Sequence, residues 1–155
     1  MYSASNNQSD ARIAVDVMLG SWSDPVAASL LYQLASSAVF SGAIFILDEA
    51  MPGDWPPDPS SAMALKLAPG ALSTQTAEGC LCCGMRSALG DSLRQVFFDA
   101  LARRRPVPSR IVILGEGGDV EMYRQTLRHA AFLSQRYVLR YVWRIRSGCT
   151  HLPDT

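Results

Sequence analysis

Three cysteines within four residues are the part of this 155-residue chain best suited to chemistry. Cys80, Cys82 and Cys83 stand in Gly-Cys-Leu-Cys-Cys-Gly, directly before an amphipathic segment. Zinc and similar soft divalent ions prefer thiolates and a tetrahedron of four ligands. Glycines let a short loop turn tightly enough for several sulfur atoms to converge. The spacing therefore predicts a metal site at Cys80, Cys82 and Cys83, with one position open to a further ligand.

Two other interpretations of the cysteine cluster compete with metal binding. Cys80 and Cys83 form a Cys-x-x-Cys pair at the start of a predicted helix, which is the arrangement of thiol–disulfide oxidoreductases. Cys82 is unusual for that chemistry, and a long loop precedes the pair where a strand normally leads into it. The third interpretation is that the cysteines are small buried side chains without a chemical role.

The basic residues limit what else the chain can do. Its only lysine, Lys66, lies in Leu-Lys-Leu-Ala-Pro-Gly, whereas a Walker-type phosphate loop needs a lysine directly after its last glycine. The sequence therefore excludes an ordinary P-loop NTPase acting alone. Residues 86–155 carry twelve basic and six acidic side chains, and residues 1–85 carry two and eight. Because the two halves intermix in a compact domain, no nucleic-acid surface is expected.

Elements that could position the cysteines follow from the hydrophobic pattern. Short apolar runs predict buried strands at 12–19, 43–47, 110–114 and 137–145. Helical periodicity and capping residues predict helices at 25–34, 86–104 and 120–135. Strands that alternate with helices favour an α/β fold of three layers, with a mostly parallel sheet of about four to five strands and helices on both faces.

One domain is expected over residues 11–147, between a disordered tail at 1–10 and a loose tail at 148–155. Within this domain, residues 51–70 hold five of the nine prolines and predict a long loop, in which a helical turn at 60–67 is compatible with the sequence. No apolar run is long enough to span a bilayer, and the N-terminus lacks the basic start and apolar stretch of a secretory signal. We therefore expect a cytoplasmic protein without a membrane partner.

The last predicted strand alternates between apolar and basic side chains. This pattern predicts an edge strand with one solvated face. The apolar face would carry Tyr137, Leu139, Tyr141, Trp143 and Ile145, and the opposite face would carry Arg140 and Arg144.

The cluster and its surroundings resemble the CobW-type metallochaperone GTPases, which are relatives of UreG and HypB. The resemblance is carried by Glu78-Gly79-Cys80-Leu81-Cys82-Cys83, the amphipathic segment after it, Arg110-Ile111-Val112-Ile113, Leu47-Asp48-Glu49 and Gly117. It covers roughly residues 12–145. It implies a P-loop-NTPase-like, CobW-like domain at 11–147 that binds zinc or a similar ion at the cysteines.

The chain departs from this family at the residues that would act on a nucleotide. Val26 stands where the family has its phosphate-binding lysine, and Ala27 stands where it has the magnesium-binding hydroxyl. Asp24 would add a negative charge near the phosphates, and Leu114 replaces an acidic residue before the third loop. Phosphoryl transfer depends on positioning and charge stabilisation by such groups. We therefore expect a degenerate phosphate loop, no catalytic residues, and neither GTP nor magnesium as a cofactor.

The expected function is that of a CobW-like pseudo-GTPase that binds metal and acts as a metal-handling or partner-binding module. Its partner would be a second copy of the chain, a catalytically complete relative or a metal-client protein. Two alternatives remain. The first is a thiol–disulfide redox protein that uses Cys80 and Cys83. The second is a GTP-binding metallochaperone with residual nucleotide binding.

Overall fold

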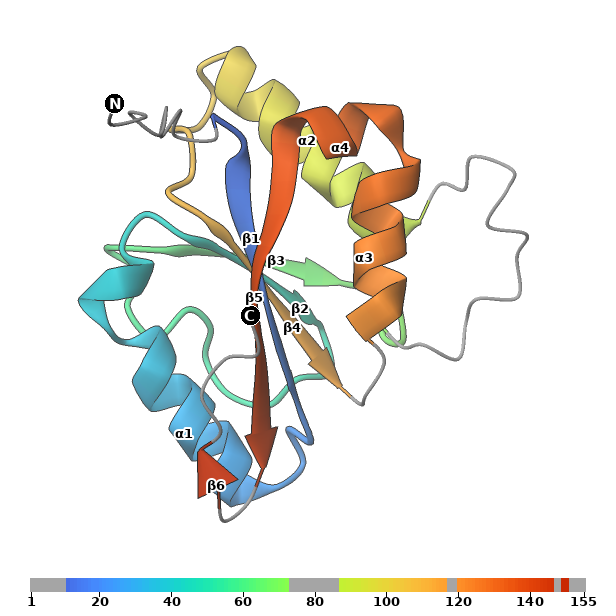
Figure 1. Ribbon diagram of the computed structural model, residues 1–155. Helices are drawn as coiled ribbons and strands as arrows, with labels where there is room; N and C mark the ends of the chain where they lie inside the picture. The colour runs from blue at the N-terminus through green and yellow to red at the C-terminus, as the bar shows by residue number, and fades with distance from the viewer. Residues whose placement is uncertain (1–10, 73–86, 117–119, 147–148, 151–155) are drawn as a thin grey trace, which may run out of the picture.

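A computed structural model describes residues 11–72, 87–116, 120–146 and 149–150, and shows a central sheet with helices on both faces (Figure 1). The strands lie in the order β3-β2-β4-β1-β5-β6. They are β1 (Ile13–Gly20), β2 (Ile44–Asp48), β3 (Met63–Leu67), β4 (Ile111–Glu116), β5 (Tyr137–Arg146) and β6 (Cys149–Thr150). The helices are α1 (Pro25–Ala35), the 3-10 turn η1 (Ala38–Phe40), α2 (Ala88–Leu101), α3 (Val120–His129) and α4 (Ala131–Arg136).

The sheet and its helices form the predicted three-layer α/β fold. Strands β1 to β5 pair in parallel, and only the two-residue β6 runs antiparallel to its neighbour. Helix α1 covers one face, and α2, α3 and α4 cover the other (Figure 1). Because successive side chains of a strand point to opposite faces, Val17 packs under α2 and α3 while Met18 packs under α1. No helix among the described residues has the length and apolar character needed to cross a membrane.

Strand β3 lies inside the proline-rich segment, where the sequence was compatible with a helical turn. Met63 to Leu67 instead pairs in parallel with β2, from Ile44 to Asp48. Four of the five proline positions lie before β3 and one after it, so the strand itself keeps every backbone N–H for the ladder. Lys66 is an exposed residue on this edge strand. The helical alternative at 60–67 is therefore wrong, and a fifth parallel strand takes its place.

The predicted helix at 120–135 is two helices rather than one. Ala130 has extended backbone angles, φ −87° and ψ 108°, and separates α3 from α4. The change of direction brings Leu133, which is buried, onto α2, where its Cδ1 atom faces the backbone of Gly90. Packing of α4 across α2 therefore outweighs the helical propensity of a continuous segment.

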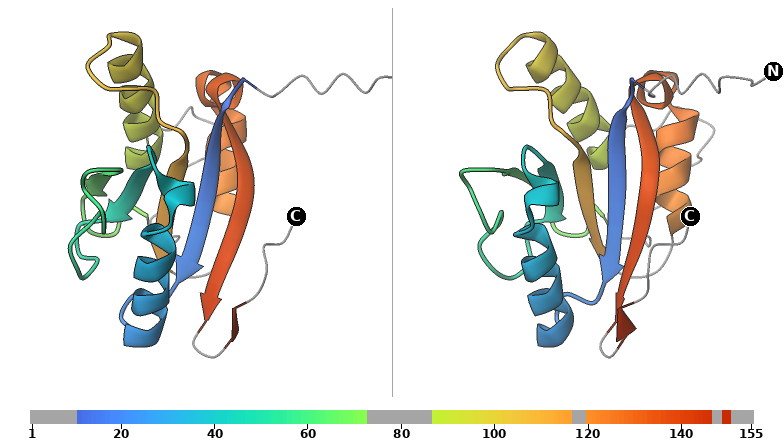
Figure 2. Two further views of the ribbon diagram at one scale, coloured as in Figure 1. Left: turned by 90° about the vertical axis from the view of Figure 1, so that its left-hand side faces the viewer. Right: turned by 60° about the vertical axis from the view of Figure 1, so that its left-hand side comes forward.

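Strand β5 is the last parallel strand at the end of the sheet opposite β3, and it lies next to β1 (Figure 2). Val15 pairs with Leu139 and Asp16 pairs with Tyr141, so Arg140 is an extra residue in a β-bulge. The bulge reverses the facing of the later residues: Leu139 packs against the core under α3, whereas Trp143 packs under α1. The predicted single apolar face of this strand is therefore wrong, because a register shift cannot be read from alternation alone.

Candidate functional site

The carboxyl ends of β1 and β4 form the topological switch point of the sheet. Gly20 lies opposite Glu116 in the parallel register. The chain leaves β1 toward α1 on one face and leaves β4 toward α3 on the other. In open parallel sheets this divergence creates the crevice where ligands bind. The family resemblance places its phosphate loop at this same point.

Trp22 fills the space directly over the end of β1. Its side chain is buried, with 4% of its surface exposed, in the core under α1. A Cβ atom built on Gly20 would lie 2.7 Å from the Trp22 ring and 3.2 Å from the carbonyl oxygen of Ile145. The absence of a side chain at Gly20 therefore makes room for an indole ring, in the place where a phosphate loop would leave room for a ligand.

Asp24 occupies the amino end of α1 with its own negative charge. Its Oδ1 atom accepts a hydrogen bond from the backbone N–H of Val26 at 3.0 Å. Its backbone carbonyl accepts the first helical hydrogen bond, from the N–H of Ala28 at 2.9 Å. The amides at a helix amino end are the groups that would hold a phosphate. Here the Asp24 carboxylate takes that role as an N-cap.

Replacing Asp24 with alanine should lower the free energy of unfolding by about 1 kcal/mol, because α1 loses its N-cap hydrogen bond. Asp24→Ser is the matched control, since the serine hydroxyl also caps helices but carries no charge. Urea denaturation followed by circular dichroism measures both. Equal losses in the two variants would contradict the capping role and assign the effect to the carboxylate charge.

At three positions where the family resemblance would place nucleotide-binding residues, this chain has apolar side chains, and two of these side chains are buried. Ala27 and Leu114 are each 1% exposed and belong to the hydrophobic core. Val26, at the position of the family lysine, is on the surface.

Asp48, at the end of β2, makes two structural hydrogen bonds. Its Oδ1 atom accepts from Ala50 N–H and its Oδ2 atom accepts from Gly70 N–H, both at 2.8 Å. These contacts tie the end of β2 to the turn after β3.

The predicted metal ligands Cys80, Cys82 and Cys83 lie outside the described residues, whereas both flanks of their segment are described. Before it, Leu72 is buried, and its carbonyl oxygen accepts a hydrogen bond from the Tyr123 hydroxyl at 3.1 Å. After it, Ser87 Oγ accepts from the N–H of Gly90 at 2.9 Å and caps α2. Within the described ranges, no group of three or more potential metal ligands occurs.

Tyr123 connects the first flank of the cysteine segment to the carboxyl edge of the sheet. Its ring packs against Gly115, the penultimate residue of β4. Burial raises the pKa of the Tyr123 hydroxyl to about 12, so this group is a neutral hydrogen-bond donor at physiological pH. The connection that carries the cysteines therefore departs from the switch-point edge of the sheet.

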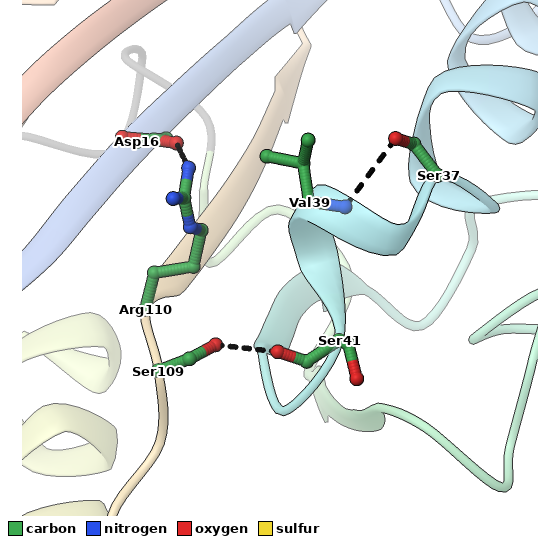
Figure 3. Close-up of polar contacts among 6 residues, drawn as sticks. All are labelled: Asp16, Ser37, Val39, Ser41, Ser109 and Arg110. Atoms are coloured by element: carbon green, nitrogen blue, oxygen red, sulfur yellow. Dashed lines mark hydrogen bonds and ion pairs between the residues drawn. The ribbon is translucent and has the colours of Figure 1, made fainter.

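A buried ion pair on the α1 face is the site that sequence reasoning missed. Asp16 lies in the middle of β1 with its side chain 1% exposed, and its Oδ2 atom accepts from Arg110 Nη1 at 3.0 Å (Figure 3). The Arg110 guanidinium also lies over the Phe40 ring, 5.6 Å from its centroid. The signal in the sequence was an aspartate inside the apolar run Ile-Ala-Val-Asp-Val, which must find a positive partner if buried.

The electrostatics of this pair are dominated by burial. Desolvation raises the pKa of the Asp16 carboxyl above its ordinary value, and the Arg110 charge and hydrogen bond oppose that rise. Within the described chain, Asp16 Oδ1 and Arg110 Nε have no hydrogen-bond partner. Nearby, Ser109 Oγ donates to the Ser41 carbonyl at 2.7 Å and closes β4 against the turn before β2 (Figure 3). The pair holds β1 and β4 together at the amino half of the sheet.

Taken together, the fold and the loops at its carboxyl edge define a three-layer α/β protein with a mainly parallel sheet. No family model, curated protein or solved structure matches the chain.

Proposed function

We propose that this protein is a metal-binding α/β domain that holds zinc or a similar soft divalent ion through Cys80, Cys82 and Cys83. The observation that carries the proposal is three thiols within four residues, on a connection whose two flanks are fixed by Leu72 and Ser87. Because the three thiols are so close in sequence, only a short loop has to close for their sulfur atoms to converge.

The chemistry of the donor set suits a thiophilic ion. Thiolates bind zinc at about 2.3 Å, and a set of three leaves the fourth tetrahedral position for water, another side chain or a partner protein. An open position suits a protein that passes metal on or senses it. We propose such a metal-handling role, in which the partner is a second copy, a catalytically complete relative or a metal-client protein.

Nucleotide hydrolysis is not part of the proposed function. Trp22 fills the space over the end of β1, and Asp24 caps the helix that would hold the phosphates. A carboxylate at that position repels phosphate, and no lysine is available to neutralise it. The domain would therefore resemble CobW-type proteins in fold and metal chemistry and differ from them in lacking the reaction. Titration calorimetry with GTP and magnesium tests this, and tight binding would contradict it.

Metal content tests the principal proposal. Protein purified without chelator should hold about one zinc ion per chain, as measured by inductively coupled plasma mass spectrometry. Cys82→Ser should lose most of that metal, because a two-thiolate site binds zinc far less tightly. Cys149→Ser, which removes the cysteine outside the cluster, is the matched control and should retain it.

Thiol alkylation separates metal binding from redox chemistry. In the proposed state, the three clustered thiols are protected from iodoacetamide by zinc and become reactive after chelation. A disulfide between Cys80 and Cys83 would instead be released by reductant and not by chelator. Metal-free protein that takes up no added zinc, or a Cys82→Ser variant that keeps its full metal content, would overturn the proposal.

A further inference from the structure

A cleft of about 310 Å³ lies between α3 and the first half of β5, at the amino edge of the sheet. Its position is set by Arg12, which precedes β1, and by Tyr137, which pairs with Ile13 at the start of both strands. The cysteine segment, by contrast, leaves from the carboxyl edge near Tyr123. Neither Leu72 nor Ser87, the described residues that flank the cysteine segment, lines the cleft.

Four arginines line this cleft, and none of the lining residues in the described part of the chain is acidic. They come from three parts of the fold: Arg12 before β1, Arg124 and Arg128 on α3, and Arg140 in the bulge of β5. The nearest carboxylate along α3, Glu121, is not a lining residue. Convergence of positive charge from separate elements is a tertiary arrangement, and a solvated helix face does not account for it.

Arg124 is held without a full set of hydrogen bonds. Its Nε atom is buried and finds no acceptor among the described residues. Arg128 lies one helical turn further on the same face of α3, and like charges at this spacing destabilise a helix by about 0.2–0.5 kcal/mol. A bound anion would offer an acceptor to Arg124 Nε and would relieve the repulsion between Arg124 and Arg128.

The walls also contain fixed and apolar parts. Arg12 Nη1 donates to the Ser134 carbonyl at 3.2 Å, which positions its guanidinium at the rim. Leu127, Tyr137 and Val142 are buried lining residues, and the Tyr137 hydroxyl is turned away to donate to the Leu93 carbonyl. The cleft thus combines an apolar floor with a cationic rim, as small-molecule sites do.

The β5 bulge is part of how the cleft is formed. The extra residue is Arg140. Within β5, Leu139 before it packs on the α3 side of the sheet, and Trp143 after it packs on the α1 side. Bulges redirect side chains and are frequent beside binding sites. Arg140, the bulged residue, lines the cleft together with its neighbours Val138 and Leu139.

We propose that this cleft binds a small organic phosphate, with the phosphate among the arginines and the apolar part of the ligand on the floor. Guanidinium groups form paired, parallel hydrogen bonds to phosphate oxygens, and they remain charged at every physiological pH. The volume suits a ligand of a few tens of atoms or fewer and is too small for a folded partner. Concavity and an apolar floor favour this ligand over RNA or an anionic membrane, which bind to extended basic surfaces.

Calorimetric titration of the full chain with phenyl phosphate, inorganic phosphate and adenosine monophosphate tests the proposal. At least one organic phosphate should bind with one-to-one stoichiometry and more tightly than inorganic phosphate, because only the former reaches the floor. Arg124→Gln/Arg128→Gln should weaken that binding by roughly tenfold or more, since charge-assisted hydrogen bonds contribute at least this factor. The single variant Arg128→Glu, at an exposed position, should abolish it.

The matched control is Arg103→Gln/Arg104→Gln, which removes the same charge from exposed residues after α2 and should leave affinity unchanged. A melting temperature for Arg124→Gln that is equal to or above that of the unmodified protein is expected, because the residue is poorly satisfied without ligand. No saturable binding of any probe, or equal loss in the control, would overturn the proposal. So would tighter binding to single-stranded RNA or phosphatidylserine vesicles that depends on Arg124 and Arg128.

Discussion

Arg110→Met should lower the free energy of unfolding by about 3 kcal/mol at neutral pH, the lower end of the range for removing one partner of a buried ion pair, because the Arg110 side chain is 27% exposed. The reason is that Asp16, 1% exposed in β1, would keep a charge with no counter-ion. Methionine preserves much of the apolar stem that packs beside Phe40. The loss would therefore report on the charge. Urea denaturation at pH 7 measures it.

The double variant Asp16→Asn/Arg110→Met is the control for this prediction. It removes both charges and leaves a neutral amide in place of the buried carboxylate. It should be more stable than Arg110→Met alone, because the unpaired buried charge accounts for most of the stability that the single variant loses. A double variant that is no more stable than the single one would show that Arg110 acts by packing.

The same pair predicts a pH dependence with a defined sign. Burial raises the pKa of Asp16 in the folded protein above its ordinary value of 3.8. As the pH falls, the folded protein therefore takes up this proton before the unfolded chain does, and the Asp16 contribution to stability rises. The free-energy cost of ionising Asp16 in the folded protein is fully present at pH values above the pKa of the folded state. It is absent at pH values below the pKa of the unfolded state. In Arg110→Met this pKa rises further, so the deficit should shrink at about pH 5. A deficit that is constant with pH would contradict this account.

Gly115→Ala should lower the free energy of unfolding by about 2–3 kcal/mol, because the site has no room for a methyl group. A Cβ atom there would overlap the Tyr123 hydroxyl oxygen and lie 2.9 Å from Leu19 Cδ2. Both neighbours are buried, and the Tyr123 ring is held by its hydrogen bond to the Leu72 carbonyl. Tyr123 cannot move without disturbing its hydrogen bond to Leu72, where the cysteine connection begins.

Tyr123→Phe separates the two parts of that prediction. Alone, it should cost about 1 kcal/mol through the lost hydrogen bond to Leu72. Combined with Gly115→Ala, it removes the atom that the new methyl group overlaps most closely. The double variant should therefore lose less stability than the sum of the two single variants, as measured by chemical denaturation. Strict additivity would show that the backbone of β4 relaxes around the added methyl group without help from Tyr123.

Much of the fold was predictable because the central strands are covered on both faces. Because β1, β2 and β4 are buried on both faces, their sequences are nearly continuous apolar runs. Such runs can be recognised as strands from the local sequence, without knowledge of which strand pairs with them. Strand β3 was missed because an edge strand of five residues carries little pattern, and its pairing with β2 is a tertiary contact. The break at Ala130 was missed for a related reason, since the packing of Leu133 on α2 decides it.

The functional residues show the same difference between what a local sequence pattern reveals and what only tertiary contacts decide. Cys80, Cys82 and Cys83 are close in sequence, so their chemistry could be proposed from spacing alone, and their metal site stays a prediction. The arginines of the cleft are spread from Arg12 to Arg140 and converge only through the β1–β5 pairing and its bulge. In sequence they contributed only to the basic excess of the second half of the chain. No local pattern could have shown that they face one another.

The bulge in β5 also affects how readily another chain could pair with this edge of the sheet. Over Tyr137 to Arg144 the described residues give β5 no strand on its outer side, because β6 begins pairing only at Ile145. An open edge of this kind is a template on which another chain could add a strand and start a fibril. The extra residue at Arg140 interrupts the regular spacing that such an addition needs, and Arg140 and Arg144 place charge along it. The irregularity beside the cleft thus also makes this edge a poorer template for an added strand.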